Sequence, residues 1–208
     1  MHPTTQQIVS TKILPLFYHD DYVLCKKNIL ACYEAGVHVF EFTNRGNQAL
    51  AHFQRLKNEL SVECPDLKLG IGTIFTGAAA QQYIDAGADF IIQPVCTAEV
   101  ATVCKKANLP WIPGVMTPNE IYQAMALGAE LVKVFPANVL GKAYLKAVLG
   151  PLPQANLMVT GGVDATSEDV QSWLNAGAKA CGLGSQLFNN SPETITQLLT
   201  EIIHQIHA

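Results

Sequence analysis

The segment ALGAELVKVFP, residues 126–136, combines the end of a helix, a glycine and a short apolar run. Leu, Val and Phe favour strands, and the proline ends the run. The same order recurs in EAGVHVFEFT (34–43), DAGADFIIQP (85–94) and NAGAKACGLG (175–184). The glycines of the four segments, Gly36, Gly87, Gly128 and Gly177, fit the position where a chain leaves a helix in a left-handed conformation. Their separations of 51, 41 and 49 residues leave room for two β–α units in each interval.

Short apolar runs alternate with amphipathic stretches along the whole chain. The predicted strands are residues 12–17, 38–43, 68–73, 89–94, 110–114, 131–136, 156–161 and 179–184. Helical patterns lie between them, for example over residues 20–35 and 117–127, and residues 194–206 fit a closing amphipathic helix. Eight strands alternating with helices indicate a parallel sheet, and we expect an α/β protein with a (β/α)8 TIM barrel.

The domain organisation follows from the same pattern. No linker or low-complexity segment divides the chain, so residues 1–208 are predicted to form a single barrel domain, with residues 1–11 as a short polar N-terminal segment. A doubly wound open sheet is the alternative. Its GxGxxG turn after the first strand is absent, because the chain there reads FYHDD (17–21).

Composition excludes several classes of function. The chain has 208 residues, of which 49% are hydrophobic and 14% charged, and a formal charge of −4, so it has no basic surface typical of nucleic-acid or anionic-membrane binding. The N-terminus lacks the pattern of a signal peptide. Six cysteines without a CxxC pair indicate reduced thiols in a cytoplasmic protein. Cysteine and histidine spacings match no metal template, and we expect no metal.

A lysine and a glutamate stand out in two predicted strands. Alternation places Lys133 on the opposite face from Val132 and Val134, which suit the helix layer, so Lys133 is expected to point into the barrel. In HVFEFTNRG (38–46) the same rule turns Glu41 inward. A buried carboxylate needs a partner, which Lys133 or Arg45 could provide. Barrel active sites lie at the carboxyl ends of the strands, where Lys133 is predicted.

Two structural interpretations remain open for these residues. Lys133 could be an ordinary strand lysine whose stem packs while its amine reaches solvent. Glu41 and its partner could form an ion pair without chemistry.

Glycine-rich turns follow the seventh and eighth predicted strands. They read TGG (160–162) and GLGS (182–185). The loops after these two strands are the usual phosphate site of a TIM barrel, because glycine lets backbone N–H groups approach an anion closely. The sequence therefore predicts a phosphate site there, with the Ser185 hydroxyl as an additional donor.

Six segments occur in an order that resembles a known enzyme family. They are EFTNR (41–45), GIGT (70–73), PGVMTPNE (113–120), LVKVFPAN (131–138), VTGGV (159–163) and GLGS (182–185). The chain is similar, from about residue 12 to about residue 190, to the class I aldolases that cleave 2-keto-3-deoxy-6-phosphogluconate (KDPG) or 4-hydroxy-2-oxoglutarate (KHG).

The resemblance implies roles for individual residues. Lys133 matches the lysine that forms a Schiff base with the substrate, and Glu41 matches the general acid and base. The remaining matches are Arg45 and Thr73 for the pyruvate carboxylate, Pro94 and Phe135 for the pyruvate pocket, and Gly161, Gly162 and Ser185 for the phosphate. The family also implies a homotrimer and a reaction that needs no cofactor, since the imine on Lys133 carries the chemistry.

The chain departs from the family pattern at several positions. Tyr18 and His19 stand where the family often has an arginine, Gln93 and Val95 replace the residues of an SPG motif, and Asn44 replaces a leucine. These departures concern substrate specificity rather than the lysine chemistry.

Three functions are consistent with the sequence. The first is an aldolase that cleaves KDPG to pyruvate and glyceraldehyde 3-phosphate, and also KHG to pyruvate and glyoxylate. The second is a phosphosugar isomerase or epimerase on the same barrel, in which Lys133 acts as a charge or base. The third is a non-catalytic phosphosugar-binding protein. All three bind a small molecule rather than a nucleic acid or a membrane.

Overall fold

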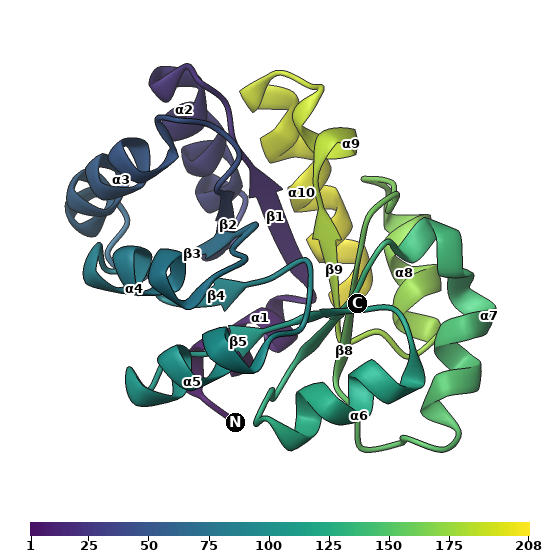
Figure 1. Ribbon diagram of the computed structural model, residues 1–208. Helices are drawn as coiled ribbons and strands as arrows, with labels where there is room; N and C mark the ends of the chain where they lie inside the picture. The colour runs from purple at the N-terminus through teal and green to yellow at the C-terminus, as the bar shows by residue number, and fades with distance from the viewer.

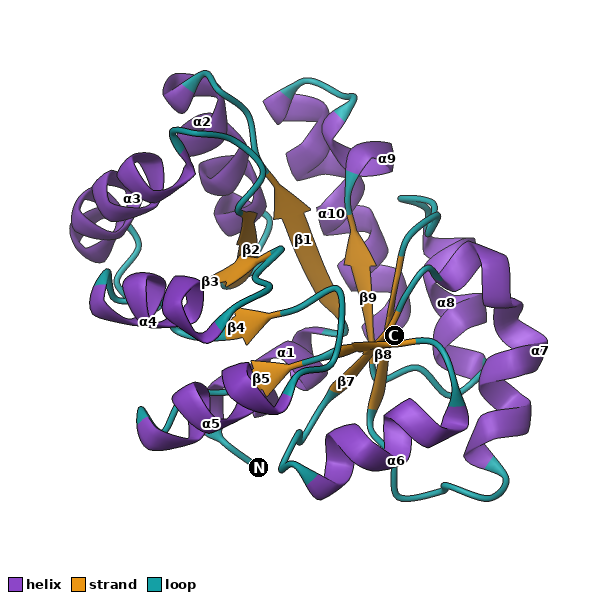
Figure 2. Cartoon of the chain, viewed as in Figure 1, coloured by secondary structure: helices purple, strands orange, loops and turns teal.

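Parallel strands form a ring at the centre of the molecule, and helices surround it (Figure 1, Figure 2). The fold is described over residues 1–208 in a computed structural model. The strands are β1 Ile13–Phe17, β2 Val39–Thr43, β3 Lys68–Gly72, β4 Ile91–Ile92, β5 Trp111–Ile112, β6 Gly114–Val115, β7 Val132–Val134, β8 Leu157–Thr160 and β9 Ala180–Leu183. Their order in the sheet is β5-β4-β3-β2-β1-β9-β8-β7-β6. All pairs in this sheet are parallel, as predicted.

The helices alternate with the strands along the chain. They are α1 Pro3–Thr11, α2 Tyr22–Glu34, α3 Ala49–Glu63, α4 Gly77–Asp85, α5 Ala98–Lys106, α6 Pro118–Ala126, α7 Ala137–Leu149, α8 Ser167–Asn175, α9 Ser185–Phe188 and α10 Pro192–His207. None of them is both long and apolar enough to cross a bilayer.

The sheet closes through one strand that is interrupted at Pro113. β5 pairs with β4, where the Gln93 N–H donates to the Ile112 carbonyl at 3.0 Å. β6 pairs with β7, where the Lys133 N–H donates to the Pro113 carbonyl at 2.8 Å. Because proline has no N–H, the ladder is broken there, but both halves keep their neighbours. β5 and β6 together therefore form one of the eight strands of the barrel. The predicted (β/α)8 barrel is confirmed rather than the open doubly wound sheet.

The four repeated glycines end helices α2, α4, α6 and α8. Gly36, Gly87, Gly128 and Gly177 all have positive φ angles, between 87° and 108°. After each glycine, the next N–H donates to a carbonyl five residues back, for example from Val37 to Cys32 at 3.0 Å. This is the Schellman motif, and it turns each helix directly into the next strand.

The N-terminal residues form helix α1, which the sequence analysis did not assign. Pro3 occupies the first turn, and the His2 imidazole accepts a hydrogen bond from the Thr4 N–H. The Glu130 carboxylate accepts another from the His2 N–H at 2.7 Å. Ile8 is fully buried, and this single apolar anchor is too little to give a helical pattern in the polar sequence.

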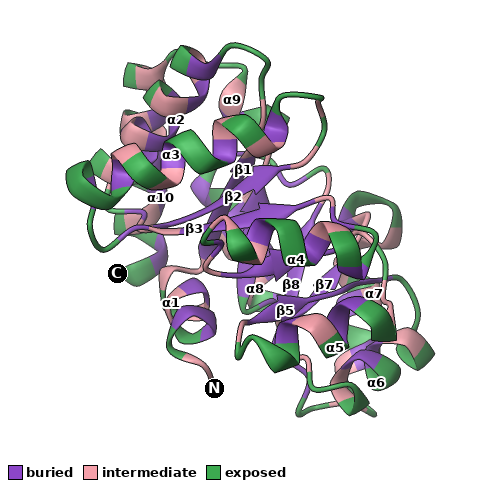
Figure 3. Cartoon of the chain, turned by 60° about the vertical axis from the view of Figure 1, so that its left-hand side comes forward, coloured by how far each residue is buried: buried purple, intermediate pink, exposed green.

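Burial follows the strands, while the outer faces of the helices are exposed (Figure 3). The six cysteines are free, and five of them are buried. Glu41 and Lys133 are the only charged residues of the chain that are buried. A buried charge is costly unless it is paired, so packing alone does not explain why Glu41 and Lys133 are buried.

Candidate active site

Lys133 lies in the middle of β7 and points into the barrel. Its Cα partners are Gly114 on β6 and Met158 on β8, and the residue is only 5% exposed. The ammonium Nζ lies 3.8 Å from Glu41 Oε1 and 5.4 Å from the centre of the Phe135 ring. A distance of 3.8 Å is too long for a direct hydrogen bond, so the two charges interact through space or through a bridging molecule.

Glu41 lies on β2, on the opposite side of the ring from β7, and is 1% exposed. Its Oε2 atom is buried and has no hydrogen-bond partner. Gly72 makes the space for this side chain, because a Cβ atom at Gly72 would lie 1.7 Å from Glu41 Oε1. An unpartnered buried carboxylate oxygen is rare in native proteins and is typical of functional sites.

Burial raises the pKa of the Glu41 carboxyl above its ordinary value of 4.5, while the charges of Lys133 and Arg45 oppose this shift. Burial has the larger effect because water cannot solvate the carboxylate. A carboxyl group whose pKa moves toward neutrality is suited to accept a proton in one step and return it in another.

A cavity of about 300 Å³ opens above this pair. Phe135 and Thr43 line it, and they lie two residues beyond Lys133 and Glu41 on the same strand faces. Lys133 and Glu41 are not themselves among the lining residues, and this spacing places the pair one layer deeper in the barrel. The lining consists of Leu16, Phe17, Tyr18, Thr43, Arg45, Phe135, Thr160, Gly161, Gly162, Val163, Gly182, Gly184, Ser185, Gln186, Phe188 and Asn189. Arg45 is the only charged residue among them.

The predicted phosphate loops meet on one wall of the cavity. Gly161 and Gly162 have φ angles of 96° and 70°, a conformation that favours glycine. A Cβ atom at Gly162 would lie 2.5 Å from that of Asn138, so the loop packs directly on the start of α7. Ser185 begins α9, after the neighbouring strand β9, and lines the same cavity. This wall offers neutral hydrogen-bond donors and no cation.

Thr73 and Pro94 are not among the residues that line the cavity. Thr73 follows β3 with a φ angle of 63°, which for a β-branched residue costs about 1–3 kcal/mol. Such strain often marks functional sites. Pro94 follows β4, and its backbone lies 2.5 Å from the position of a Cβ at Gly114, the neighbour of Lys133. Both residues are thus at the carboxyl ends of strands.

The departures from the family pattern have different positions. Gln93 is fully buried, where its Oε1 accepts from the Trp111 indole at 2.8 Å and its Nε2 donates to Thr97 at 3.1 Å. It does not line the cavity. Val95 is 39% exposed and does not line it either, whereas Tyr18 does.

Thr160 is a lining residue that the sequence analysis did not single out. It is 4% exposed, and its hydroxyl has no hydrogen-bond partner. Thr160 lies two residues after Met158, the Cα partner of Lys133, and therefore shares the inward face. Strand alternation in NLMVTG could have identified it, but a threonine in a strand is too common to attract attention.

No three or more His, Cys, Asp or Glu side chains are grouped so that they could hold a metal ion.

Comparison with known proteins identifies the family. The family model described as KDPG and KHG aldolase matches residues 5–200. The chain belongs to this aldolase family. It is therefore an aldolase, which is a carbon–carbon lyase.

Individual members agree with this assignment. The 2-dehydro-3-deoxy-phosphogluconate aldolase of Haemophilus influenzae is 35% identical over 78% of this chain and 77% of its own length. A 4-hydroxy-2-oxoglutarate/2-dehydro-3-deoxyphosphogluconate aldolase from TTHB1 has a TM-score of 0.84 at 27% identity, covering 99% of both chains. The KDPG aldolase of Legionella pneumophila, solved with pyruvate as a covalent carbinolamine intermediate, has a TM-score of 0.84 at 27% identity over 94% of this chain and 96% of its own.

Proposed function

We propose that this aldolase cleaves KDPG to pyruvate and glyceraldehyde 3-phosphate through an imine on Lys133. The observation that carries the proposal is the buried Lys133 amine, 3.8 Å from the buried Glu41 carboxylate and one layer beneath the residues that line the cavity. The covalent pyruvate adduct of the Legionella relative supports the same chemistry. The nucleophile that this chemistry needs is the amine of a lysine.

The reaction begins when neutral Lys133 attacks the C2 ketone, and loss of water gives an iminium ion. Glu41, directly or through a water, then takes the proton of the C4 hydroxyl. The C3–C4 bond breaks, its electrons pass to the iminium nitrogen, and the aldehyde leaves. Glu41 returns the proton to C3 of the resulting enamine, and hydrolysis releases pyruvate and the free lysine. The raised pKa of Glu41 suits this exchange.

The two ends of the substrate have separate partners in this proposal. Arg45, the one charge in the cavity lining, pairs with the carboxylate of the keto acid, together with Thr73. Phe135 and Pro94 shape the pyruvate pocket. Gly161, Gly162 and Ser185 bind the phosphate through neutral donors, as phosphate loops of barrels do.

KHG is a second candidate substrate. It keeps the 2-keto acid group and the C4 hydroxyl but ends in a carboxylate instead of a phosphate. Neutral donors on the glycine-rich wall can bind either anion, so the same Lys133 chemistry would release pyruvate and glyoxylate.

We also infer that the protein is a cytoplasmic homotrimer. Exposed apolar side chains follow the neighbouring strands β3, β4, β6 and β7, namely Phe75, Val95, Met116 and Val139, which are 39% to 66% exposed. Such exposed apolar residues on one side of the barrel mouth suit contact between subunits. Light scattering after gel filtration tests this, and a monomer at micromolar concentration would contradict it.

The deciding experiment is borohydride reduction in the presence of pyruvate, followed by peptide mass spectrometry. We expect one pyruvate-derived adduct, on Lys133. Lys142 is a matched control, since it also lies on the β7–α7 segment but pairs with Asp169 at 2.6 Å. Lys142→Met should keep the adduct and Lys133→Met should lose it. Turnover of a phosphosugar without any adduct would favour an isomerase or epimerase, and tight binding without turnover a binding protein.

A further inference from the structure

Arg45 lies in a short loop directly after β2. The side chain is exposed and makes no ion pair or hydrogen bond within the chain. Hydrogen bonds fix the backbone of this loop. The Asn44 N–H donates to the Gly72 carbonyl and the Arg45 N–H to the Thr43 carbonyl, both at 2.9 Å. The direction of the guanidinium therefore depends on how the neighbours of Arg45 are held.

The residue before Arg45 is held by Tyr83 from helix α4. The Tyr83 hydroxyl donates to Asn44 Oδ1 at 2.8 Å, across 39 residues of sequence. Tyr83 is 2% exposed, and burial raises its pKa to about 12, so the phenol keeps its proton at neutral pH. A buried tyrosine with one well-placed acceptor is a rigid support.

The residue after Arg45 is held by Tyr18 from the end of β1. A Cβ atom at Gly46 would lie 2.1 Å from the Tyr18 hydroxyl, so the ring lies directly against the Gly46 backbone. That hydroxyl also donates to Asp20 Oδ1 at 2.6 Å, which fixes its position. Only glycine at position 46 permits this approach.

The two tyrosines belong to one continuous aromatic cluster. Ring centres of Tyr18 and Phe42 are 5.5 Å apart, those of Phe42 and Phe53 6.3 Å, and those of Phe53 and Tyr83 5.3 Å. Phe42 and Phe53 are fully buried. Aromatic rings packed at these distances prefer defined relative orientations, so the cluster forms a stiff base beneath residues 44–46.

We infer that Tyr83 and Tyr18 are positioning residues that hold Arg45 in the direction of the substrate carboxylate. The inference rests on the proposed function and deepens it, because it assigns the affinity for 2-keto acids to the Tyr83–Asn44 bond and the Tyr18–Gly46 contact. Holding the residues on both sides of an exposed arginine reduces the conformations that it must lose when it binds an anion. Tyr83 does not line the cavity, whereas Tyr18 does.

The test measures the pyruvate concentration that gives half-maximal borohydride trapping on Lys133. Tyr83→Phe removes the hydroxyl and keeps the ring, and we expect it to raise this concentration about 3- to 10-fold, as one lost hydrogen bond would. Asn44→Ala should have the same effect, and the double variant no more than either single one, because both remove the same bond. Trapping at saturating pyruvate should stay near the wild-type level.

Tyr144→Phe is the matched control. The Tyr144 hydroxyl also donates from a helix to a loop at the carboxyl ends of the strands, to the Met116 carbonyl at 2.9 Å, but it does not touch the Arg45 loop. This variant should trap pyruvate as the wild type does.

A second ketone separates positioning of Arg45 from general support of the pocket. Hydroxyacetone has a ketone but no carboxylate, so Tyr83→Phe should leave its half-maximal concentration unchanged. An equal rise for both ketones would mean that Tyr83 supports the whole pocket, and this overturns the inference. An unchanged value for pyruvate in a folded variant also overturns it. Absence of any adduct in the wild type is a different result, since it refutes the proposed function itself.

Discussion

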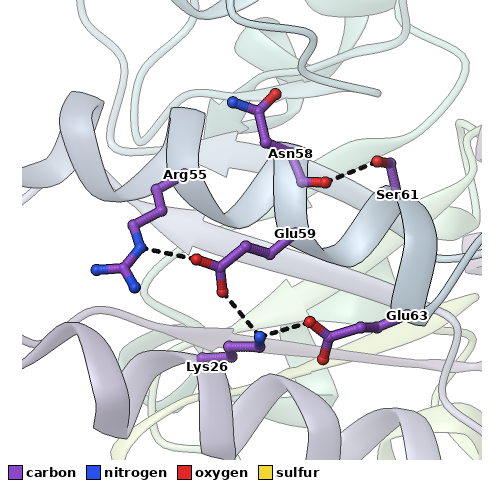
Figure 4. Close-up of polar contacts among 6 residues, drawn as sticks. All are labelled: Lys26, Arg55, Asn58, Glu59, Ser61 and Glu63. Atoms are coloured by element: carbon purple, nitrogen blue, oxygen red, sulfur yellow. Dashed lines mark hydrogen bonds and ion pairs between the residues drawn. The ribbon is translucent and has the colours of Figure 1, made fainter.

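The lysine–glutamate pair inside the barrel differs from the ion-pair network between α2 and α3, although a lysine bonded to glutamate is at the centre of that network as well. In the network, Lys26 Nζ lies 2.8 Å from Glu59 and 2.6 Å from Glu63, and Arg55 bonds the second oxygen of Glu59 at 2.7 Å (Figure 4). Inside the barrel, Lys133 and Glu41 are 3.8 Å apart and have no other charged partner within ion-pair distance. The exposed group has the better geometry.

The pKa values of the Glu59 and Glu41 carboxyl groups are shifted in opposite directions. Hydrogen bonds from Lys26 and Arg55 lower the pKa of Glu59 to about 2. Burial raises the pKa of Glu41, and its lysine only partly opposes this. Ion pairs at the surface contribute little to stability, and a buried pair with poor geometry contributes less than its desolvation costs. The difference agrees with the proton-transfer role that we propose for Glu41.

The strongest test of this contrast is Lys133→Met. We expect loss of cleavage by about 10⁴-fold or more, because no other residue can form the imine. The melting temperature should not fall, since Glu41 can take up a proton and remain buried in its neutral form. Activity assays and calorimetry measure the two effects, and residual activity near the wild-type level would exclude the imine mechanism.

Glu41→Gln should reduce kcat by about 10²- to 10⁴-fold, the usual contribution of a general acid or base. In the wild type, activity should fall as pH decreases through the raised pKa of Glu41, above 4.5, because the proton acceptor is lost. The variant should lack this acidic limb.

Stability gives a second readout at Glu41. Between 4.5 and the raised pKa the folded protein binds more protons than the unfolded chain, so stability should decrease as pH rises through this range. Denaturant titrations at several pH values should show this slope in the wild type and not in Glu41→Gln. A slope of the opposite sign would mean that the carboxylate is stabilised by its partners, as in Glu59.

Gly72→Ala tests the space that Gly72 provides for Glu41. The new methyl group would lie 1.7 Å from Oε1 in the present geometry, so the carboxylate must move. We expect a loss of about 1–3 kcal/mol in stability from overpacking and about 10- to 100-fold in kcat/KM from misplacement of the acid–base group.

Gly150→Ala is the control for this change, because Gly150 has a φ angle of −58° and the nearest atom to its Cβ position is 3.3 Å away. Its activity should be unchanged. Equal activity of the two alanine variants would show that the exact place of Glu41 is unimportant.

Lys26→Met should have the smallest effect. It removes the centre of the exposed network but lies outside the cavity lining, so kcat and KM should equal those of the wild type. We expect only a small decrease in melting temperature. At high salt the difference between the variant and the wild type should be smaller still, because salt screens the ion pairs. A large loss of activity would contradict the separation of the two regions.

The sequence predicted the strands of the fold well because each is a short apolar run bounded by a glycine or a proline. All eight predicted strands are present, and the four repeated glycines have the expected left-handed conformation. Closure at Pro113 was beyond prediction, since it depends on which neighbours the two halves of that strand find. Helix α1 was missed because its contacts with Glu130 come from a distant part of the chain.

The candidate site was predictable where a polar residue interrupts a strand, as at Lys133 and Glu41. Alternation gave the direction of these side chains but not the 3.8 Å between them, which depends on the diameter of the ring. Arg45 and the glycine loops lie on the cavity as expected, whereas Thr73 and Pro94 do not line it. The hydrogen bond from Tyr83 to Asn44 joins residues 39 positions apart, and no local sequence pattern predicts it. The roles of all these residues remain predictions.

The positions of β2 and β7 have a consequence for how such an enzyme can arise. Three barrel strands separate β2 from β7 in each direction around the ring, when β5 and β6 are taken as one strand. Glu41 and Lys133 therefore come from opposite halves of the chain. The first half also supplies Arg45, and the second supplies both glycine loops. Under the proposed mechanism, a chain with only one half would lack either the lysine or the carboxylate, so exchanging halves between relatives would test the distance between them.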